Sequence, residues 1–230
     1  MSNIDYIGSE LEIFQYAVNW KEYWSSSIVK FIKGDVLEVG AGIGTNTIIF
    51  KNTHFCSWTS VEPDRKLVEK LKQNLNDSSY NVVHGTIKDT PGDSFYDTIL
   101  YIDVIEHIEK DREELLNAYE KLKVGGHLII LVPAHNFLYS EFDKSIGHFR
   151  RYSRKELLYV IPAELNLLNI RYLDSLGVMA STVNKVFLKQ PSPNKSQILF
   201  WDRVIIPISR IMDRILFYKM GKSLVGIWKK

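Results

Sequence analysis

Hydrophobic and polar positions form two different patterns along the chain. Residues 9–32 contain no Gly or Pro, and their aromatic side chains recur at helical spacing, which predicts one or two helices. From residue 35 onward, short apolar runs alternate with longer amphipathic stretches. The apolar runs predict strands at 35–40, 57–63, 81–85, 96–104 and 127–134. The amphipathic stretches predict helices from about Thr45, at 64–75 and at 110–123, with the last one stopped by Val124-Gly125-Gly126.

Strands that alternate with helices are typical of a parallel, doubly wound α/β sheet with helices on both faces. After Pro133 the alternation of predicted strands and helices ends, because residues 135–153 mix polar and aromatic side chains without a clear period. A helix from about Arg154 and a strand at 169–179 are predicted next. An amphipathic helix at 197–220 follows, with a kink or interruption at Pro207. We therefore predict an N-terminal helical cap (1–34), a main domain (35–188) and a C-terminal amphipathic extension (189–230).

Composition and charge narrow the class of protein. The chain has 230 residues, of which 45% are hydrophobic and 24% charged, with a net charge of +2, as in ordinary globular proteins. Its single cysteine, Cys56, excludes a disulfide scaffold. No secretory signal is visible and no apolar run approaches the roughly 18 residues of a membrane span, so we expect a cytoplasmic protein. Residues 144–230 carry 16 basic and only 5 acidic side chains, which indicates either a solvated basic surface or an anionic partner.

Three glycines mark the candidate ligand site. Gly40, Gly42 and Gly44 lie in the segment EVGAGIGT, directly after a predicted strand. This is neither the G-x-G-x-x-G fingerprint of dinucleotide-binding proteins nor a phosphate-binding loop ending in G-K-[ST], so a ligand without a pyrophosphate fits better. Glu62 closes the next strand, where a carboxylate can accept hydrogen bonds from both hydroxyls of a ribose. The alternative for Glu62 is a plain surface charge.

Five segments together carry a resemblance to a known family: LEVGAGIGTNT, SVEPD, HGTIKD, YDTILYIDVIEHI and LKVGGHLIILVPA. In this order and spacing, over about residues 30–135, the chain resembles the class I S-adenosylmethionine-dependent methyltransferases. The resemblance implies a Rossmann-like, seven-stranded sheet whose last strand is antiparallel. It also implies that S-adenosylmethionine is the cofactor and lies across the carboxyl ends of the first strands.

The resemblance also implies roles for individual residues. Its cofactor-binding residues are Glu38, Gly40, Ala41, Gly42, Glu62, Pro63, Thr86, Ile87 and Asp103. Of these, Glu62 would hold the ribose, Ile87 would pack on the adenine, and Asp103 would lie near the methionine amino group or the sulfonium. Thr86 departs from the family pattern, in which Asp often contacts the adenine amino group.

The segment D-V-I-E-H offers three potential metal ligands, Asp103, Glu106 and His107. It resembles an E-V-L-E-H stretch of ubiquinone-type O-methyltransferases, in which a divalent ion has been implicated. The alternative, which we favour, is that Glu106 and His107 begin a helix and fix the following loop. We therefore predict no metal site.

The acceptor is expected at residues 135–153. The segment SEFDKSIGHFRRYS resembles a G-H-x-R-R-Y stretch of bacterial methyltransferases associated with polysaccharide and lipid-linked sugar pathways. His148 is the candidate general base, Arg150 and Arg151 could grip a phosphate or carboxylate, and Tyr152 could pack against the cofactor or acceptor. The alternative is that His148 and Arg151 form salt bridges that tie the loop to the acidic body of the protein.

The leading hypothesis is methyl transfer to a small or lipid-linked acceptor, at oxygen. Alternatives are an RNA methyltransferase, a nicotinamide-dependent oxidoreductase and a non-catalytic partner subunit. The chain lacks the Asn-Pro-Pro-Tyr or Asp-Pro-Pro-Tyr mark of enzymes that methylate DNA bases, so no DNA substrate is expected. The apolar face predicted at 197–220 has three interpretations: packing on the domain, a homodimer contact, or peripheral attachment to the inner face of a membrane.

Overall fold

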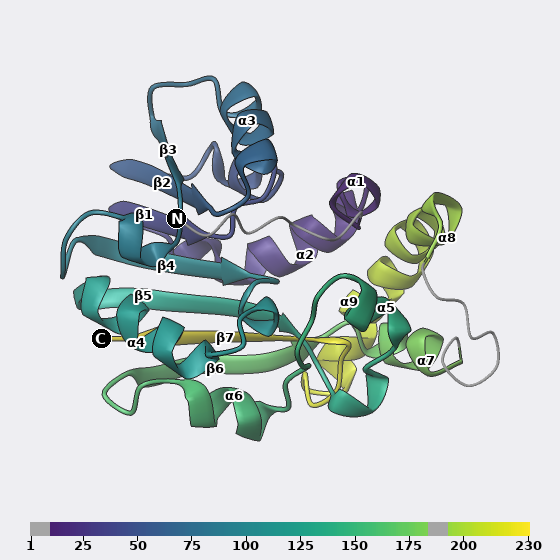
Figure 1. The fold of residues 1–230 in the computed structure, drawn as a ribbon. Helices are drawn as coiled ribbons and strands as arrows, with labels where there is room; N and C mark the ends of the chain where they lie inside the picture. The colour runs from purple at the N-terminus through teal and green to yellow at the C-terminus, as the bar shows by residue number, and fades with distance from the viewer. Residues whose placement is uncertain (1–9, 184–192) are drawn as a thin grey trace.

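The alternation predicted from the sequence is present in the computed structural model, which describes residues 10–183 and 193–230 (Figure 1). The strands are β1 (Asp35–Val39), β2 (Ser57–Glu62), β3 (Tyr80–His84), β4 (Tyr96–Ile102), β5 (Leu122–Pro133), β6 (Asn166–Leu173) and β7 (Ser223–Lys229). The α-helices are α1 (Glu10–Phe14), α2 (Val18–Ile28), α3 (Arg65–Asn74), α4 (Asp111–Lys121), α5 (Glu141–Ser145), α6 (Arg154–Val160), α7 (Ser175–Val183), α8 (Lys195–Phe200) and α9 (Ile206–Ile215). Short 3-10 turns are η1 (Val29–Phe31), η2 (Thr47–Phe50), η3 (Ile87–Asp89), η4 (Ile105–His107) and η5 (Asn136–Leu138), and a π-helical turn, η7 (Trp201–Ile205), joins α8 to α9.

The strands form one seven-stranded sheet in the order β3-β2-β1-β4-β5-β7-β6. Strands β1 to β5 pair in parallel, and β7 is antiparallel to both of its neighbours. The predicted seven-stranded sheet with an antiparallel last strand is therefore confirmed. The order reverses between β1 and β4, and ligands of such sheets bind outside the carboxyl ends of the strands at that point.

Alternating side chains of the strands build an apolar core on each face of the sheet. On one face, Leu37 of β1 lies in a cluster with Leu115 of α4 and Leu157 of α6. The opposite face packs against Trp24 of α2 and Ile206 of α9. Helices α2 and α9, which come from opposite ends of the described chain, thus share the core of the sheet.

Strand β7 is the main feature that the sequence analysis missed. It lies between β5 and β6 and therefore completes the sheet from within the segment 189–230 that was predicted to be an extension. Lysines flank this short strand and Gly226 interrupts its apolar pattern, which hides it. In the fold, Trp228 occupies the space above Gly226, because a Cβ built there would lie 2.1 Å from the Trp228 ring.

Three other elements differ from their predicted form. The glycine loop leads into the short turn η2 instead of a helix from Thr45. Helix α4 ends at Lys121, before the Val124-Gly125-Gly126 segment that was predicted to stop it. That segment belongs to β5, where the pairing with β4 shifts between Tyr96 and Thr98 and residues 123–126 form a bulge. The strand expected at 169–179 covers Asn166–Leu173, and α7 begins directly after it. No helix of the described residues is long and apolar enough to span a bilayer.

Candidate functional site

A cavity of about 1380 Å³ lies at the carboxyl ends of the parallel strands. Its wall comes from the loops that follow β1, β2, β3 and β4, from the loop 138–151, and from α1, α7 and α8. Figure 1 shows these helices gathered at the end of the sheet where β4 and β5 finish. Because a pocket for one small ligand usually measures about 300–1,000 Å³, this cavity has room for two ligands.

Eight of the nine predicted cofactor residues line this cavity. They are Gly40, Ala41, Gly42, Glu62, Pro63, Thr86, Ile87 and Asp103. The glycine loop turns sharply there, with φ of +67° at Gly40 and +56° at Gly42. A Cβ at Gly40 would lie 2.7 Å from Val104, so only glycine fits between the loop and η4. The glycine loop thus packs closely against η4 and also lines the cavity.

Glu62 is fixed at the edge of the cavity by two backbone donors. Its side chain is 5% exposed, and its two carboxylate oxygens each accept one hydrogen bond of 2.9 Å, from the amides of Gly42 and Asp64. Burial raises the pKa of this carboxyl, and the two amides act in the opposite direction. Each carboxylate oxygen keeps a second lone pair, so Glu62 could still accept hydrogen bonds from two ligand hydroxyls.

Glu38 is the one predicted cofactor residue that does not line the cavity. It is buried beneath the glycine loop, and one of its carboxylate oxygens accepts hydrogen bonds from the Thr47 hydroxyl (2.5 Å) and the Trp58 indole (3.1 Å). Burial raises the pKa of Glu38 to about 7. In this structure Glu38 holds η2 in place under the loop, and its contact with the methionine and ribose stays a prediction.

Asp103 directly follows β4 and lines the cavity. Its backbone adopts φ of +54°, an uncommon conformation for a non-glycine residue that is often found at functional sites. Asp103 is exposed to the cavity, but the cavity walls exclude enough water from the carboxyl to raise its pKa to about 7, although the positive charges of Lys222 and Arg151 act against this shift. Lys222 lines the same cavity and was missed from the sequence, because the residues just before β7 were not assigned to the sheet.

His148 faces the cavity from the loop that follows α5. Its Nδ1 lies 3.0 Å from the buried carboxylate of Asp143, and its Nε2 lies 3.8 Å from Glu106 Oε1. Burial alone would raise the pKa of Asp143, but the hydrogen bond from His148 and the charge of Arg151 hold it well below its usual value. If the neutral imidazole donates from Nδ1 to Asp143, its Nε2 carries the free lone pair that a general base needs. This Asp143–His148 pair was missed in part, since the sequence analysis singled out only the histidine.

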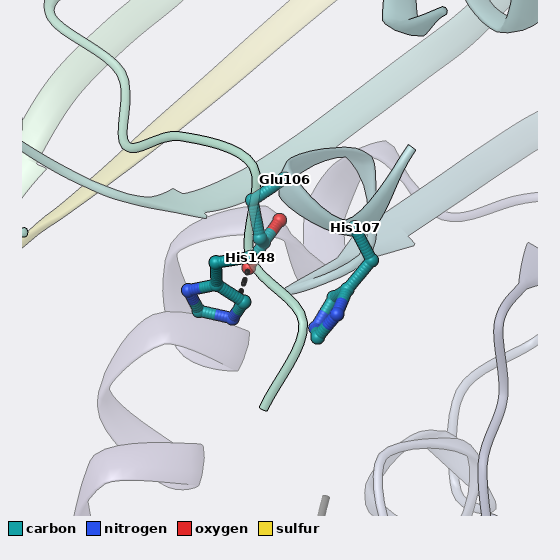
Figure 2. A group of neighbouring side chains, drawn as sticks. All are labelled: Glu106, His107 and His148. Atoms are coloured by element: carbon teal, nitrogen blue, oxygen red, sulfur yellow. Dashed lines mark ion pairs between the residues drawn. The ribbon is translucent and has the colours of Figure 1, made fainter. Parts of the chain in front are cut away.

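Glu106, His107 and His148 lie together, and one possible ligand atom of each lies within 4.8 Å of the others (Figure 2). Both Glu106 oxygens are buried without a hydrogen-bond partner. Burial lowers the pKa of His107 to about 4, so its ring is neutral. Such a set could hold a divalent transition metal. The third potential ligand is His148, whereas the sequence suggested Asp103. Glu106 also fixes the loop, because its backbone carbonyl accepts a 2.8 Å hydrogen bond from the Phe149 amide.

The main role of Arg150, Arg151 and Tyr152 is to fasten the loop to the rest of the protein. Arg151 lines the cavity, but its guanidinium is paired with Asp143 at 2.7 and 3.0 Å. Arg150 and Tyr152 do not line the cavity, and both donate hydrogen bonds to the carboxylate of Asp111 in α4. Arg150 and Tyr152 therefore fasten the loop to α4, and their contact with the acceptor stays a prediction. The structure favours the alternative in which salt bridges tie this loop to the body.

Comparisons with known proteins agree with this geometry. A family model described as a methyltransferase domain matches residues 19–176. The chain is 28% identical over 100 residues to the ubiquinone biosynthesis O-methyltransferase of Rickettsia typhi, a match that covers 43% of the chain and 40% of that relative's length. Its fold is similar to a SAM-dependent methyltransferase from Archaeoglobus fulgidus (TM-score 0.62, 17% identity, 96% of this chain and 97% of that one). It is also similar to the N-methyltransferase NodS from Bradyrhizobium japonicum in complex with S-adenosylhomocysteine (TM-score 0.60, 11% identity, 94% and 87% of the two chains).

Proposed function

The chain belongs to the methyltransferase-domain family, and from this premise we propose that it transfers the methyl group of S-adenosylmethionine to a hydroxyl of a small or lipid-linked acceptor. The observation that carries this proposal is one continuous cavity. Its wall includes both the glycine loop with Glu62 and the pair formed by His148 and Asp143. A cofactor and an acceptor bound together in that cavity would lie side by side.

The cofactor end of the cavity is the part lined by the glycine loop and Glu62. In this proposal Glu62 accepts hydrogen bonds from the ribose hydroxyls, and Ile87 packs against the adenine ring. The bound cofactor supplies an electrophilic methyl group on a positively charged sulfur. Asp103 faces the cavity at the end of β4, where its carboxylate would stabilise positive charge on the amino group or sulfur of the ligand.

The acceptor end is the part next to His148. When an acceptor hydroxyl attacks, His148 Nε2 takes the hydroxyl proton, and the Asp143 carboxylate stabilises the imidazolium that results. The remaining work of the protein is to orient the reacting groups and exclude water, which lowers barriers by up to about 7–11 kcal/mol in well-aligned reactions. A positioned base is needed when the acceptor is a hydroxyl or a protonated amine, so its presence supports an acceptor of one of these two kinds.

The apolar side chains of the cavity support an acceptor with an apolar body. The wall contains many aliphatic and aromatic side chains, among them Phe14, Leu138, Phe142, Ile146, Ile198, Phe200 and Trp201. Such a wall binds apolar groups by removing their surface from water and leaves orientation to a few polar side chains. A lipid-linked molecule with a hydroxyl in its head group has this chemistry, whereas an RNA strand would need basic and stacking contacts along a groove.

Transfer of label from tritiated S-adenosylmethionine tests this function. We expect label to enter the organic phase when the protein is incubated with polyprenyl-phosphate-linked sugars, and hydriodic acid to release it as methyl iodide, because O-methyl ethers cleave in this way. Parallel reactions contain bulk RNA or a simple phenol. Label that enters only RNA, or that hydriodic acid does not release, would contradict the proposal.

A further inference from the structure

The helical segment formed by η7 and α9 is inverted relative to an ordinary amphipathic helix. Its buried face carries polar side chains at Asp202, Ser209 and Asp213, and Ile206 is the only large apolar side chain buried there. Apolar side chains lie instead on the side that faces solvent. A surface helix normally buries its apolar stripe and exposes its polar one, so this arrangement needs a separate explanation.

Directional hydrogen bonds fix the inverted orientation. Asp202 accepts a 2.8 Å bond from the Trp20 amide and a 2.9 Å bond from the Asn19 side chain, which tie η7 to α2. Asp213 accepts hydrogen bonds from the Tyr23 hydroxyl (2.7 Å) and from the amides that open α7. Rotating the helix to bury its apolar side would leave these buried acceptors and donors without partners, at a cost of about 1–3 kcal/mol each.

We define the outer face as the exposed apolar side chains Phe200, Val204, Ile208, Ile211, Ile215 and Phe217. The first five recur every three or four residues and so form one stripe along the helical segment. Ile211 is 63% exposed, Ile215 is 62% exposed, and Phe217 just beyond the helix is 78% exposed. A contiguous apolar surface of this kind on a soluble domain marks a site of interaction.

The charges around the outer face have one sign. Arg203, Arg214 and Lys219 are exposed on the same segment, and Arg210 is half-buried. The only acidic residues between positions 193 and 220 are Asp202 and Asp213, and both are buried in the hydrogen bonds described above. Apolar side chains with basic neighbours and no exposed acid match the interface of an anionic bilayer, in which a helix lies parallel to the surface.

We propose that the outer face docks this protein on the surface of an anionic lipid bilayer, with α9 lying in the membrane plane. Apolar side chains of the outer face enter the acyl boundary, and the basic side chains contact lipid phosphates. Two apolar side chains of the segment predicted as amphipathic do not belong to the outer face: Ile198 is buried in the core and Trp201 packs against it.

The outer face also leads toward the cavity. Phe200 belongs to the outer face and lines the cavity, and Val183 of α7 likewise lines the cavity while being about half exposed. A lipid-linked acceptor could therefore keep its hydrocarbon chain in the bilayer while its head group reaches His148. This consequence rests on the proposed function, whereas docking itself does not.

Flotation with lipid vesicles tests the docking. We expect the full chain to float with vesicles of phosphatidylglycerol and phosphatidylcholine at low salt, and much less with pure phosphatidylcholine. The double variant Ile211→Ser/Ile215→Ser should bind at least about tenfold more weakly. Arg203→Gln/Arg214→Gln should also lose more than about tenfold, because each basic residue near such a surface contributes about fivefold. The matched control Leu116→Ser/Val124→Ser changes exposed apolar side chains elsewhere and should float as the parent does.

Thermal unfolding and S-adenosylhomocysteine affinity serve as independent readouts of folding, and both should stay unchanged in all three double variants. The proposal is overturned if the parent chain does not float with either vesicle, or if the outer-face variants float as well as the control. A dimer in gel filtration with light scattering that Ile211→Ser/Ile215→Ser dissociates, without flotation of the parent, would assign the outer face to a second copy of the chain. Failure of methyl transfer with intact flotation would refute the proposed function and leave docking in place.

Discussion

Replacing Glu62 by Ala is expected to weaken the binding of S-adenosylhomocysteine by about a hundredfold or more. In the proposed complex the Glu62 carboxylate accepts hydrogen bonds from two ribose hydroxyls, and each charged hydrogen bond contributes about 1.5–3 kcal/mol. The same substitution removes the acceptor of the Gly42 amide, which lies 2.9 Å from Glu62, so the glycine loop also loses an anchor. Isothermal titration calorimetry measures the loss directly.

Two further variants separate ligand binding from folding. Glu69→Ala removes an exposed carboxylate on α3 whose only ion pair is with Arg65 among the described residues, and it should bind as the parent does. Glu62→Gln keeps the size of the side chain but replaces one acceptor by a donor, so we expect an intermediate loss. If Glu62→Ala folds and keeps its affinity for S-adenosylhomocysteine, Glu62 does not hold the ribose.

Replacing His148 by Ala should lower kcat by about 10²–10⁴-fold, the usual contribution of a positioned general base. The affinity for S-adenosylhomocysteine should stay unchanged, because His148 lies at the acceptor end of the cavity. Steady-state kinetics with the acceptor and calorimetry with the cofactor product measure the two effects separately. The matched control is His54→Ala, which removes an exposed histidine in the connection between β1 and β2.

A kcat within a few-fold of the parent would exclude His148 as the base. Loss of S-adenosylhomocysteine affinity together with kcat would instead indicate that His148 supports the cavity as a whole. His148 contacts Asp143, and Asp143 also binds the buried Arg151, so a stability measurement accompanies the kinetics. An unchanged midpoint of thermal unfolding would assign the loss of rate to chemistry.

Much of the cofactor end was predictable from sequence because its signals are local. The glycines of the loop, the strand before them and Glu62 at the end of the next strand all lie within residues 35–62, and the parallel sheet brings them together. The family predicted from these segments, and with it S-adenosylmethionine as cofactor, is confirmed by the family model. The predicted fold is confirmed by the similar solved structures. Glu38 shows the limit of this reasoning, since its position in the motif does not tell which way the carboxylate points.

The acceptor end was less predictable because its contacts join distant segments. His148 meets Glu106 only after the loop folds back on η4, and Lys222 enters the cavity only because β7 inserts between β5 and β6. The orientation of α9 is a similar case: an apolar period in the sequence is the same whether the stripe faces the core or the solvent. Hydrogen bonds from Asp202 and Asp213 to distant helices decide which side is buried.

A crystal structure of the complex with S-adenosylhomocysteine tests the central claim most directly, namely that the cavity at the carboxyl ends of the strands places a cofactor beside His148. The proposal predicts the ribose hydroxyls on the Glu62 carboxylate, the adenine against Ile87, and the sulfur on the side of Asp103 that faces His148. A ligand bound outside this cavity would contradict the claim. So would a ligand inside it whose sulfur points away from His148.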